Sequence, residues 1–234
     1  MTNNYVVIMN KGIALLVLVI LSALAGCSFS LGDNPSESQE TAPATTPVND
    51  GSDTTVATTE LDKTGATSDG LRYGADTDTG EILLSLPELG AAYNFSSESQ
   101  QRRSELTGSD RESFADQGLL KRHERVFSIA DSSADVPPVI ISTAIVYESE
   151  SEATSETPEL VESIQEAGGT SKQVDLASGI EATRIMGETQ TGRKNILMTW
   201  QTDNLVIWVF TSGIEQYYPE RTEEYLVEMV LDVP

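Results

Sequence analysis

The stretch ILMTWQTDNLVIWVFTSG, residues 196–213, decides the fold of this 234-residue chain. It holds two apolar, β-branched runs on either side of Asp203-Asn204, a pair that favours a tight turn. With the turn at that place, Trp200 faces Ile207 across two antiparallel strands. The opposite side of the second strand carries Val206, Trp208 and Phe210. Because both faces of this strand are apolar, a sheet with one side open to water is excluded.

The flanking segments extend this hairpin into an α+β domain. Residues 179–186, 195–201 and 205–211 form an antiparallel meander, and Val139–Tyr147 has the β-branched, two-sided apolar character of a central strand. The pattern of residues 219–231 predicts a helix, and its apolar face carries Tyr225, Leu226, Met229 and Val230. We expect this face to cover the sheet, including Trp208 and Phe210. The expected fold is a single domain with an antiparallel sheet and helices on at least one face.

Four further elements are predicted upstream of the meander. Residues 82–86 form a strand or a short apolar segment closed by Pro87, and residues 119–130 form a strand. A short helix over 111–117 has Ser109 as a cap and stops at Gly118. A second helix has Thr157 as its N-cap and Pro158 as its first residue, and it ends at Gly168-Gly169.

The N-terminal part predicts export and a lipid anchor. Residues 13–24 form an apolar run that follows Lys11 and ends in the small residues before Cys27, which is the pattern of a signal peptide. The run is too short to span a membrane. Either Met1 or Met9 can serve as the start. Leu24-Ala25-Gly26-Cys27 resembles the lipobox of bacterial and archaeal lipoproteins, which implies removal of residues 1–26 and a membrane partner held through lipid on Cys27.

The rest of the chain divides into a linker and a folded part. Residues 27–70 begin with the lipidated cysteine and continue as a linker rich in Ser, Thr and Asp, which has too few large apolar residues to form a core. Residues 71–234 are enough for one globular domain. We therefore expect the domain to be tethered to the outer face of the cell membrane.

The net charge of the chain limits which classes of partner it can bind. The chain has 14 Lys and Arg against 37 Asp and Glu, and its formal net charge of −23 argues against nucleic acid as a partner. This acidic composition with few lysines resembles that of proteins from extreme halophiles; an acidic surface protein of a mesophile is the alternative. The lipobox and the composition together indicate a lipoprotein of haloarchaeal type.

We predict that molar salt stabilises the folded chain. The Debye length falls to about 3 Å at 1 M salt, so repulsion among the acidic groups weakens. The melting temperature should therefore rise between about 0.1 M and 3 M potassium chloride. A melting temperature that stays constant or falls over this range would contradict the halophilic interpretation.

The sequence contains few residues of the kinds that catalyse reactions. His123 is the sole histidine and Cys27 the sole cysteine, which excludes a histidine-rich zinc site and a free thiol nucleophile. Asp76–Glu81 lacks the spacing of a calcium loop, and no phosphate-binding glycine loop is present. We expect His123 to be a half-exposed strand residue. No catalytic residue, metal site or cofactor is predicted.

Two groups of residues are candidates for binding. One is a basic set that consists of Arg102, Arg103, Arg111, Lys121, Arg122 and Arg125. This set would bind a small anionic ligand or an acidic patch of an envelope protein. Alternatively, its side chains would neutralise acidic residues within the fold. The other is an aromatic set that would anchor an interface or fill the core; it consists of Trp200, Trp208, Phe210, Tyr217 and Tyr218. Asn94-Phe95-Ser96 is a candidate N-glycosylation site.

The arrangement also resembles the PsbP-like and sensor-like α+β domains of extracytoplasmic lipoproteins. The resemblance rests on Phe114–Gly118, Val126–Ile129, the stretch ISTAIVYESESEA and residues 196–213. It implies no catalytic residues. The predicted function is a non-enzymatic interaction or ligand-sensing module on the cell surface. The binding component of an uptake system is the first alternative, and an extracytoplasmic hydrolase is the second.

Overall fold

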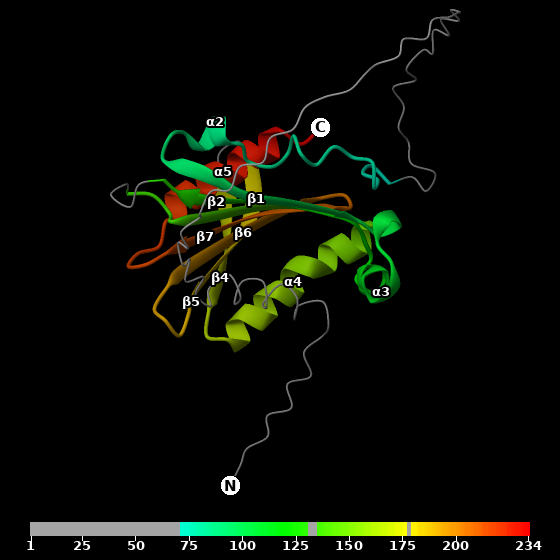
Figure 1. Cartoon of the computed structure of the whole chain (residues 1–234). Helices are drawn as coiled ribbons and strands as arrows, with labels where there is room; N and C mark the ends of the chain where they lie inside the picture. Colours follow the sequence, from blue (N-terminus) through cyan, green and yellow to red (C-terminus); the bar gives the residue numbers. More distant parts are fainter. Residues whose placement is uncertain (1–70, 131–134, 177–178) are drawn as a thin grey trace, which may run out of the picture. The chain divides into compact units, whose positions relative to one another are not determined.

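Residues 71–130, 135–176 and 179–234 are described by the computed structural model (Figure 1). The predictions for the signal segment, Cys27 and the linker lie outside these residues. None of the helices in the described ranges combines the length and the apolar character needed to cross a membrane.

A seven-stranded antiparallel sheet forms the centre of the domain. Its strand order is β1-β2-β3-β7-β6-β5-β4, so β3 and β7 are neighbours although they are far apart in sequence. The strands are β1 (Tyr93–Arg102), β2 (Leu119–Ile129), β3 (Val139–Tyr147), β4 (Thr170–Leu176), β5 (Ile180–Glu188), β6 (Lys194–Thr202) and β7 (Leu205–Gly213). The predicted α+β class with a C-terminal meander is confirmed, because β5, β6 and β7 pair in sequence order.

The hairpin of β6 and β7 has the predicted register. Trp200 lies opposite Ile207, and the chain turns at Asp203, whose φ of 48° is in the left-handed region. An aspartate tolerates this conformation better than most residues because its short polar side chain can bond locally. The position of the turn therefore sets which side chains of β7 face each side of the sheet.

Two strands were not predicted, and both lie at the edges of the sheet. β1 and β4 expose most of their side chains and have mainly polar sequences, YNFSSESQQR and TSKQVDL. An edge strand pairs on one side only and need not bury either face, so it lacks the apolar pattern from which strands are predicted. Of the two options for residues 82–86, the apolar segment is correct: residues 82–85 form no strand, and the short helix α2 (Leu86–Leu89) follows.

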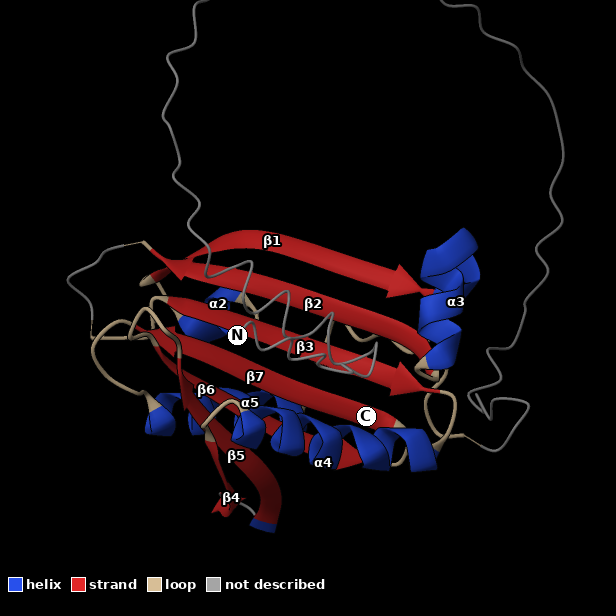
Figure 2. Ribbon diagram, turned by 90° about the horizontal axis from the view of Figure 1, so that it is seen from below, coloured by secondary structure: helices blue, strands red, loops and turns tan. Residues whose placement is uncertain are grey.

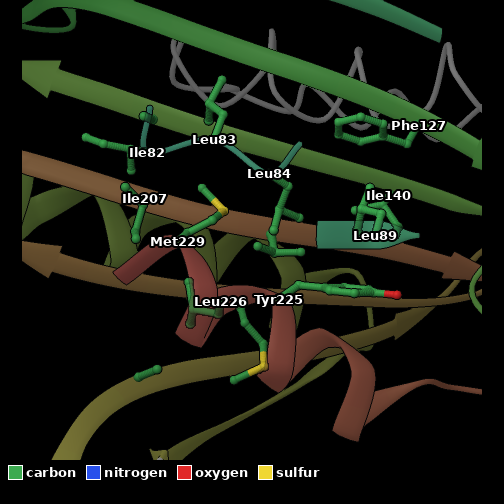
Figure 3. Close-up of a cluster of buried hydrophobic side chains, with 14 of the residues drawn as sticks. Ile82, Leu83, Leu84, Leu89, Phe127, Ile140, Ile207, Tyr225, Leu226 and Met229 are labelled. Atoms are coloured by element: carbon green, nitrogen blue, oxygen red, sulfur yellow. The ribbon is translucent and has the colours of Figure 1, made fainter. Parts of the chain in front are cut away.

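The C-terminal helix and the first part of the domain cover one face of the sheet. Helix α5 (Pro219–Leu231) has the predicted bounds, and its Tyr225, Leu226 and Met229 are buried against the sheet. Figure 3 shows Ile82, Leu83 and Leu84 packed in the same cluster. We call residues 71–84 the strap, since this segment lies across the α5 face of the sheet.

Helix α4 (Glu150–Glu166) lies on the opposite face (Figure 1). Trp208 and Phe210 are buried, but the prediction that the C-terminal helix covers them is wrong. Side chains of β7 alternate, and the core under α5 contains Ile207 and Val209. Trp208 and Phe210 therefore face the side of α4.

Helix α4 begins eight residues earlier than predicted. Its N-cap is Ser149, whose Oγ accepts a hydrogen bond from the backbone N–H of Glu152 at 3.2 Å. Pro158 lies inside the helix and removes one backbone hydrogen bond. Ala153 and Leu160 are buried on either side of the proline, so packing on the sheet holds both parts of the helix.

Two short helical elements connect the end of β1 to the start of β2. They are the 3₁₀ helix η1 (Arg103–Glu105) and helix α3 (Gly108–Asp116). Figure 2 shows the longer one, α3, beside these two strands. Helix α3 starts after Thr107 instead of at the predicted Ser109 cap, and Gly118, with φ 65°, follows its end as predicted. The positive φ of Gly118 favours glycine, and a Cβ there would lie 2.3 Å from Cδ of Glu152, so the carboxylate of Glu152 would also have to move.

Candidate functional site

The predicted basic set does not form one surface. Side chains alternate along β2, so Lys121 and Arg125 face the strap whereas Arg122 faces the side of α4. Arg111 is exposed on α3. The acidic partners within the fold are Glu105 for Arg102 (3.1 Å), Glu148 for Arg103 (2.6 Å), Glu124 for Arg122 (2.9 Å) and Glu98 for Arg125 (3.0 Å). Asn94, the candidate glycosylation site, is exposed near the start of β1.

His123 is buried, not half-exposed, and lies at the centre of a polar array under the strap. Its Nε2 lies 2.7 Å from Oε1 of Glu98, and its Nδ1 lies 3.0 Å from Oγ1 of Thr79. A hydroxyl, an imidazole and a carboxylate in this order resemble a catalytic triad in connectivity. However, the side chain of Thr79 is completely buried, so its hydroxyl cannot meet a substrate in this structure. The array instead joins the strap to β1 and β2.

The surroundings of this array favour a neutral imidazole. Burial lowers the pKa of His123; the hydrogen bond to Glu98 opposes this effect, and Arg125 and Lys121 add to it. Burial disfavours ionisation of Glu98, but the hydrogen bonds with Arg125 and His123 outweigh it and lower the pKa of the carboxyl. Neutral His123 donates from Nε2 to Glu98 and accepts at Nδ1 from Thr79.

We predict that acid weakens the fold through His123. Below the ordinary histidine pKa of 6.5, the unfolded chain takes up a proton that the folded chain does not, so the free energy of unfolding decreases. The urea midpoint should therefore be lower at about pH 5.5 than at about pH 7.5. His123→Gln, which keeps a donor for Glu98, should reduce this difference. If the urea midpoint changed equally with pH in wild type and variant, His123 would not be the source of the acid sensitivity.

A pocket of about 370 Å³ lies between α4 and the β4 edge of the sheet. Helix α4 contributes Thr157, Pro158 and Val161, and the sheet contributes Ser171, Lys172, Gln173 and Thr183. The pocket thus has an aliphatic wall on the helix and hydroxyl and amide groups on the strands. None of its seven lining residues is acidic, which is unusual for a surface site on so acidic a chain.

Hydrogen bonds hold the polar side of the pocket in place. Gln173 Nε2 donates to Thr183 Oγ1 at 2.8 Å, and Gln165 Nε2 of α4 donates to Ser171 Oγ at 2.9 Å. Thr157 Oγ1 lies 3.4 Å from Thr199 Oγ1 on β6. These contacts come from three strands and the helix, so the shape of the pocket depends on the sheet register and the position of α4.

Strand β4, beside the pocket, has a free edge. Within the described residues it pairs with β5 alone, and it is the last strand of the sheet. Half of its backbone N–H and C=O groups therefore point away from the sheet. Figure 2 shows β4 at the outer side of the strand layer. The pocket and this edge form one candidate binding site.

Sequence patterns did not identify this site. Its residues are separated in the chain. Those of β4 belong to a strand that was not predicted, Thr183 belongs to the predicted strand 179–186, and those of α4 lie where a helix start was predicted. Pro158 was the one local signal, but a proline in this context favours a helix N-terminus and says nothing about a pocket. The described residues contain no group of His, Cys, Asp and Glu arranged to hold a metal ion.

Comparisons with known proteins identify neither a family nor a function. No protein-family model matches the chain, and no curated protein matches it. Among solved structures, the crystal structure of the extracellular domain of PknH from Mycobacterium tuberculosis matches with a TM-score of 0.43 and 9% sequence identity, over 65% of this chain and 94% of that chain. A likeness at this level carries no functional argument. The resemblance to PsbP-like domains stays a prediction.

Proposed function

We propose that the chain is a lipid-tethered module outside the membrane, which binds an envelope protein at the pocket beside β4 without catalysing a reaction. The observation that carries this proposal is the pocket of about 370 Å³ next to an unpaired strand edge. A concavity whose lining side chains are hydrogen-bonded to one another, beside free backbone groups, offers both shape and hydrogen bonds to a protein partner.

The chemistry of the pocket supports binding over catalysis. Its lining has hydroxyl, amide and aliphatic groups, and Lys172 is its one ionisable residue. Ser171 and Lys172 are adjacent in a strand, so their side chains point to opposite faces and cannot act as a nucleophile and its base. Ser171 Oγ also accepts a hydrogen bond from Gln165.

The lipid tether gives a direct prediction. We expect the full chain to be recovered with the membrane and Cys27→Ser to be released into the soluble fraction, because a thioether-linked lipid needs the cysteine sulfur. Fractionation of cells that express each form, followed by immunoblotting, measures this. Recovery of both forms in the membrane pellet would contradict the lipid anchor.

Site-specific cross-linking in intact cells tests the binding proposal. The photo-reactive residue p-benzoylphenylalanine is placed at Gln173, whose side chain lies on the α4 face of β4 and lines the pocket, or, as a control, at the exposed Arg111 on α3. We expect a discrete protein adduct from position 173 and none from position 111. Adding Val161→Phe, which narrows the pocket, should abolish the adduct. The proposal fails if position 173 gives no adduct or if the adduct survives Val161→Phe.

A further inference from the structure

We infer that the partner supplies an extended segment with basic residues, which pairs with β4 as an additional strand and places a side chain in the pocket. This inference rests on the proposed function and concerns the same site. Strand addition at a sheet edge takes affinity from backbone hydrogen bonds and specificity from pockets for alternate side chains. Both features occur together at β4.

The geometry of β4 suits an incoming strand. It pairs with β5 through seven consecutive residues, from Thr170 opposite Met186 to Leu176 opposite Ile180, without a register shift. The strand contains no proline, and six of its seven side chains are exposed or half-buried. A regular ladder on one side implies a regular row of donors and acceptors on the other.

The other edge of the sheet is less suited. β1 has a register irregularity between Phe95 and Ser97, and such bulges disturb the row of donors and acceptors at an edge. The two edges also differ in their surroundings, because the pocket lined by α4 lies beside β4. The structure therefore favours β4 as the edge that accepts a partner.

The pocket determines which side chain the segment presents. Residues of a strand that point to one face are about 6.6 Å apart, so one residue of an added strand would meet the pocket while its neighbours on that face pass beyond it. Pro158 and Val161 supply an apolar wall, and the hydroxyls of Thr157 and Thr183 are already hydrogen-bonded. An aliphatic side chain fits these surroundings.

Charge indicates basic residues in the rest of the segment. Helix α4, which borders the pocket, contains no lysine or arginine, and its part after Pro158 carries three exposed glutamates, Glu159, Glu162 and Glu166. Lysine or arginine side chains next to the aliphatic residue would therefore approach an acidic helix. A second copy of this chain would bring two such helices and two net charges of −23 together, which disfavours pairing of β4 with itself.

A model peptide of alternating lysine and valine tests the inference on the purified full chain. We expect the peptide to slow amide hydrogen exchange of residues 170–176 about tenfold, because amides enter a ladder only in the bound state. The matched control is the same peptide N-methylated at every second residue, which keeps the side chains and charge but loses the donors along one edge. Its binding should be at least about tenfold weaker.

Three results would overturn the inference. Equal binding of the two peptides would exclude a backbone ladder, and binding without protection of residues 170–176 would place the peptide elsewhere. Failure of the alternating peptide to bind at about 1 mM would exclude this class of partner. The cross-link from position 173 is measured separately, so each of these results can occur while the proposed function holds.

Discussion

Asn204→Ala is expected to lower the free energy of unfolding by about 3–6 kcal/mol, because it leaves three buried backbone groups without a partner. The amide Nδ2 donates to the carbonyl of Tyr73 at 2.8 Å and to that of Tyr147 at 2.7 Å. Its Oδ1 accepts from the N–H of Tyr73 at 3.2 Å. Asn204 itself is completely buried. This one side chain connects the strap, the end of β3 and the β6–β7 turn.

Urea unfolding at constant molar salt measures the loss. The matched control is Asn94→Ala, an asparagine that is exposed in β1, produced in a host without N-glycosylation. It should change the free energy of unfolding by less than about 0.5 kcal/mol. If Asn204→Ala were as stable as Asn94→Ala, the strap would not be held through these bonds.

Leu226→Ala is expected to cost about 2–5 kcal/mol, the usual range for emptying the space of a buried leucine. Leu226 has 0% exposure and lies in the core between α5 and the sheet (Figure 3). Leu226 belongs to the same hydrophobic cluster as Ile207 of the sheet, and Met229 of this cluster lies one turn further along the helix. These neighbours belong to regular elements, so the cavity can close only in part.

Leu231→Ala is the control in the same helix. Leu231 is 63% exposed, so its truncation removes little buried area and should change the free energy of unfolding by less than about 0.5 kcal/mol. Thermal or urea unfolding of both variants gives the comparison. Equal effects would mean that α5 does not lie on the sheet as described.

The meander and the C-terminal helix were predicted well because their patterns are local and strong. β7 is apolar on both faces from Leu205 to Phe210, β6 is apolar on one face at Ile196, Met198 and Trp200, and Asp203 and Asn204 mark the turn. Helix α5 has a clear apolar stripe that starts after a proline. Edge strands β1 and β4 were missed because a strand that buries neither face needs no apolar residues.

The face on which α5 lies could not be predicted from β7. Its two sets of side chains, Ile207 with Val209 and Trp208 with Phe210, are both apolar, so either could meet the helix. The burial of His123 was equally hidden, because its partners Glu98 and Thr79 lie 25 and 44 residues away. Local sequence patterns show only the periodicity of side chains. The face that α5 covers and the burial of His123 depend on contacts between residues far apart in the chain.

The binding site depends on the fold in the same way. Thr157 and Val161 are ordinary residues of a helix, and Ser171 and Gln173 are ordinary residues of a polar strand. They form a pocket only because α4 crosses the sheet toward its β4 edge. No spacing in the chain indicates that these two segments meet.

Local patterns in the sequence predicted the α+β class, the strands of the meander, their register at the turn and the apolar face of the last helix. Each of these follows from periodicity and turn chemistry within a short window. The edges of the sheet, the helix that covers each face, the bonds that hold the strap and the position of the pocket became known from the three-dimensional fold. Those features arise from contacts between residues far apart in the chain, such as Asn204 with Tyr73, whose energies depend on burial and geometry and not on local pattern.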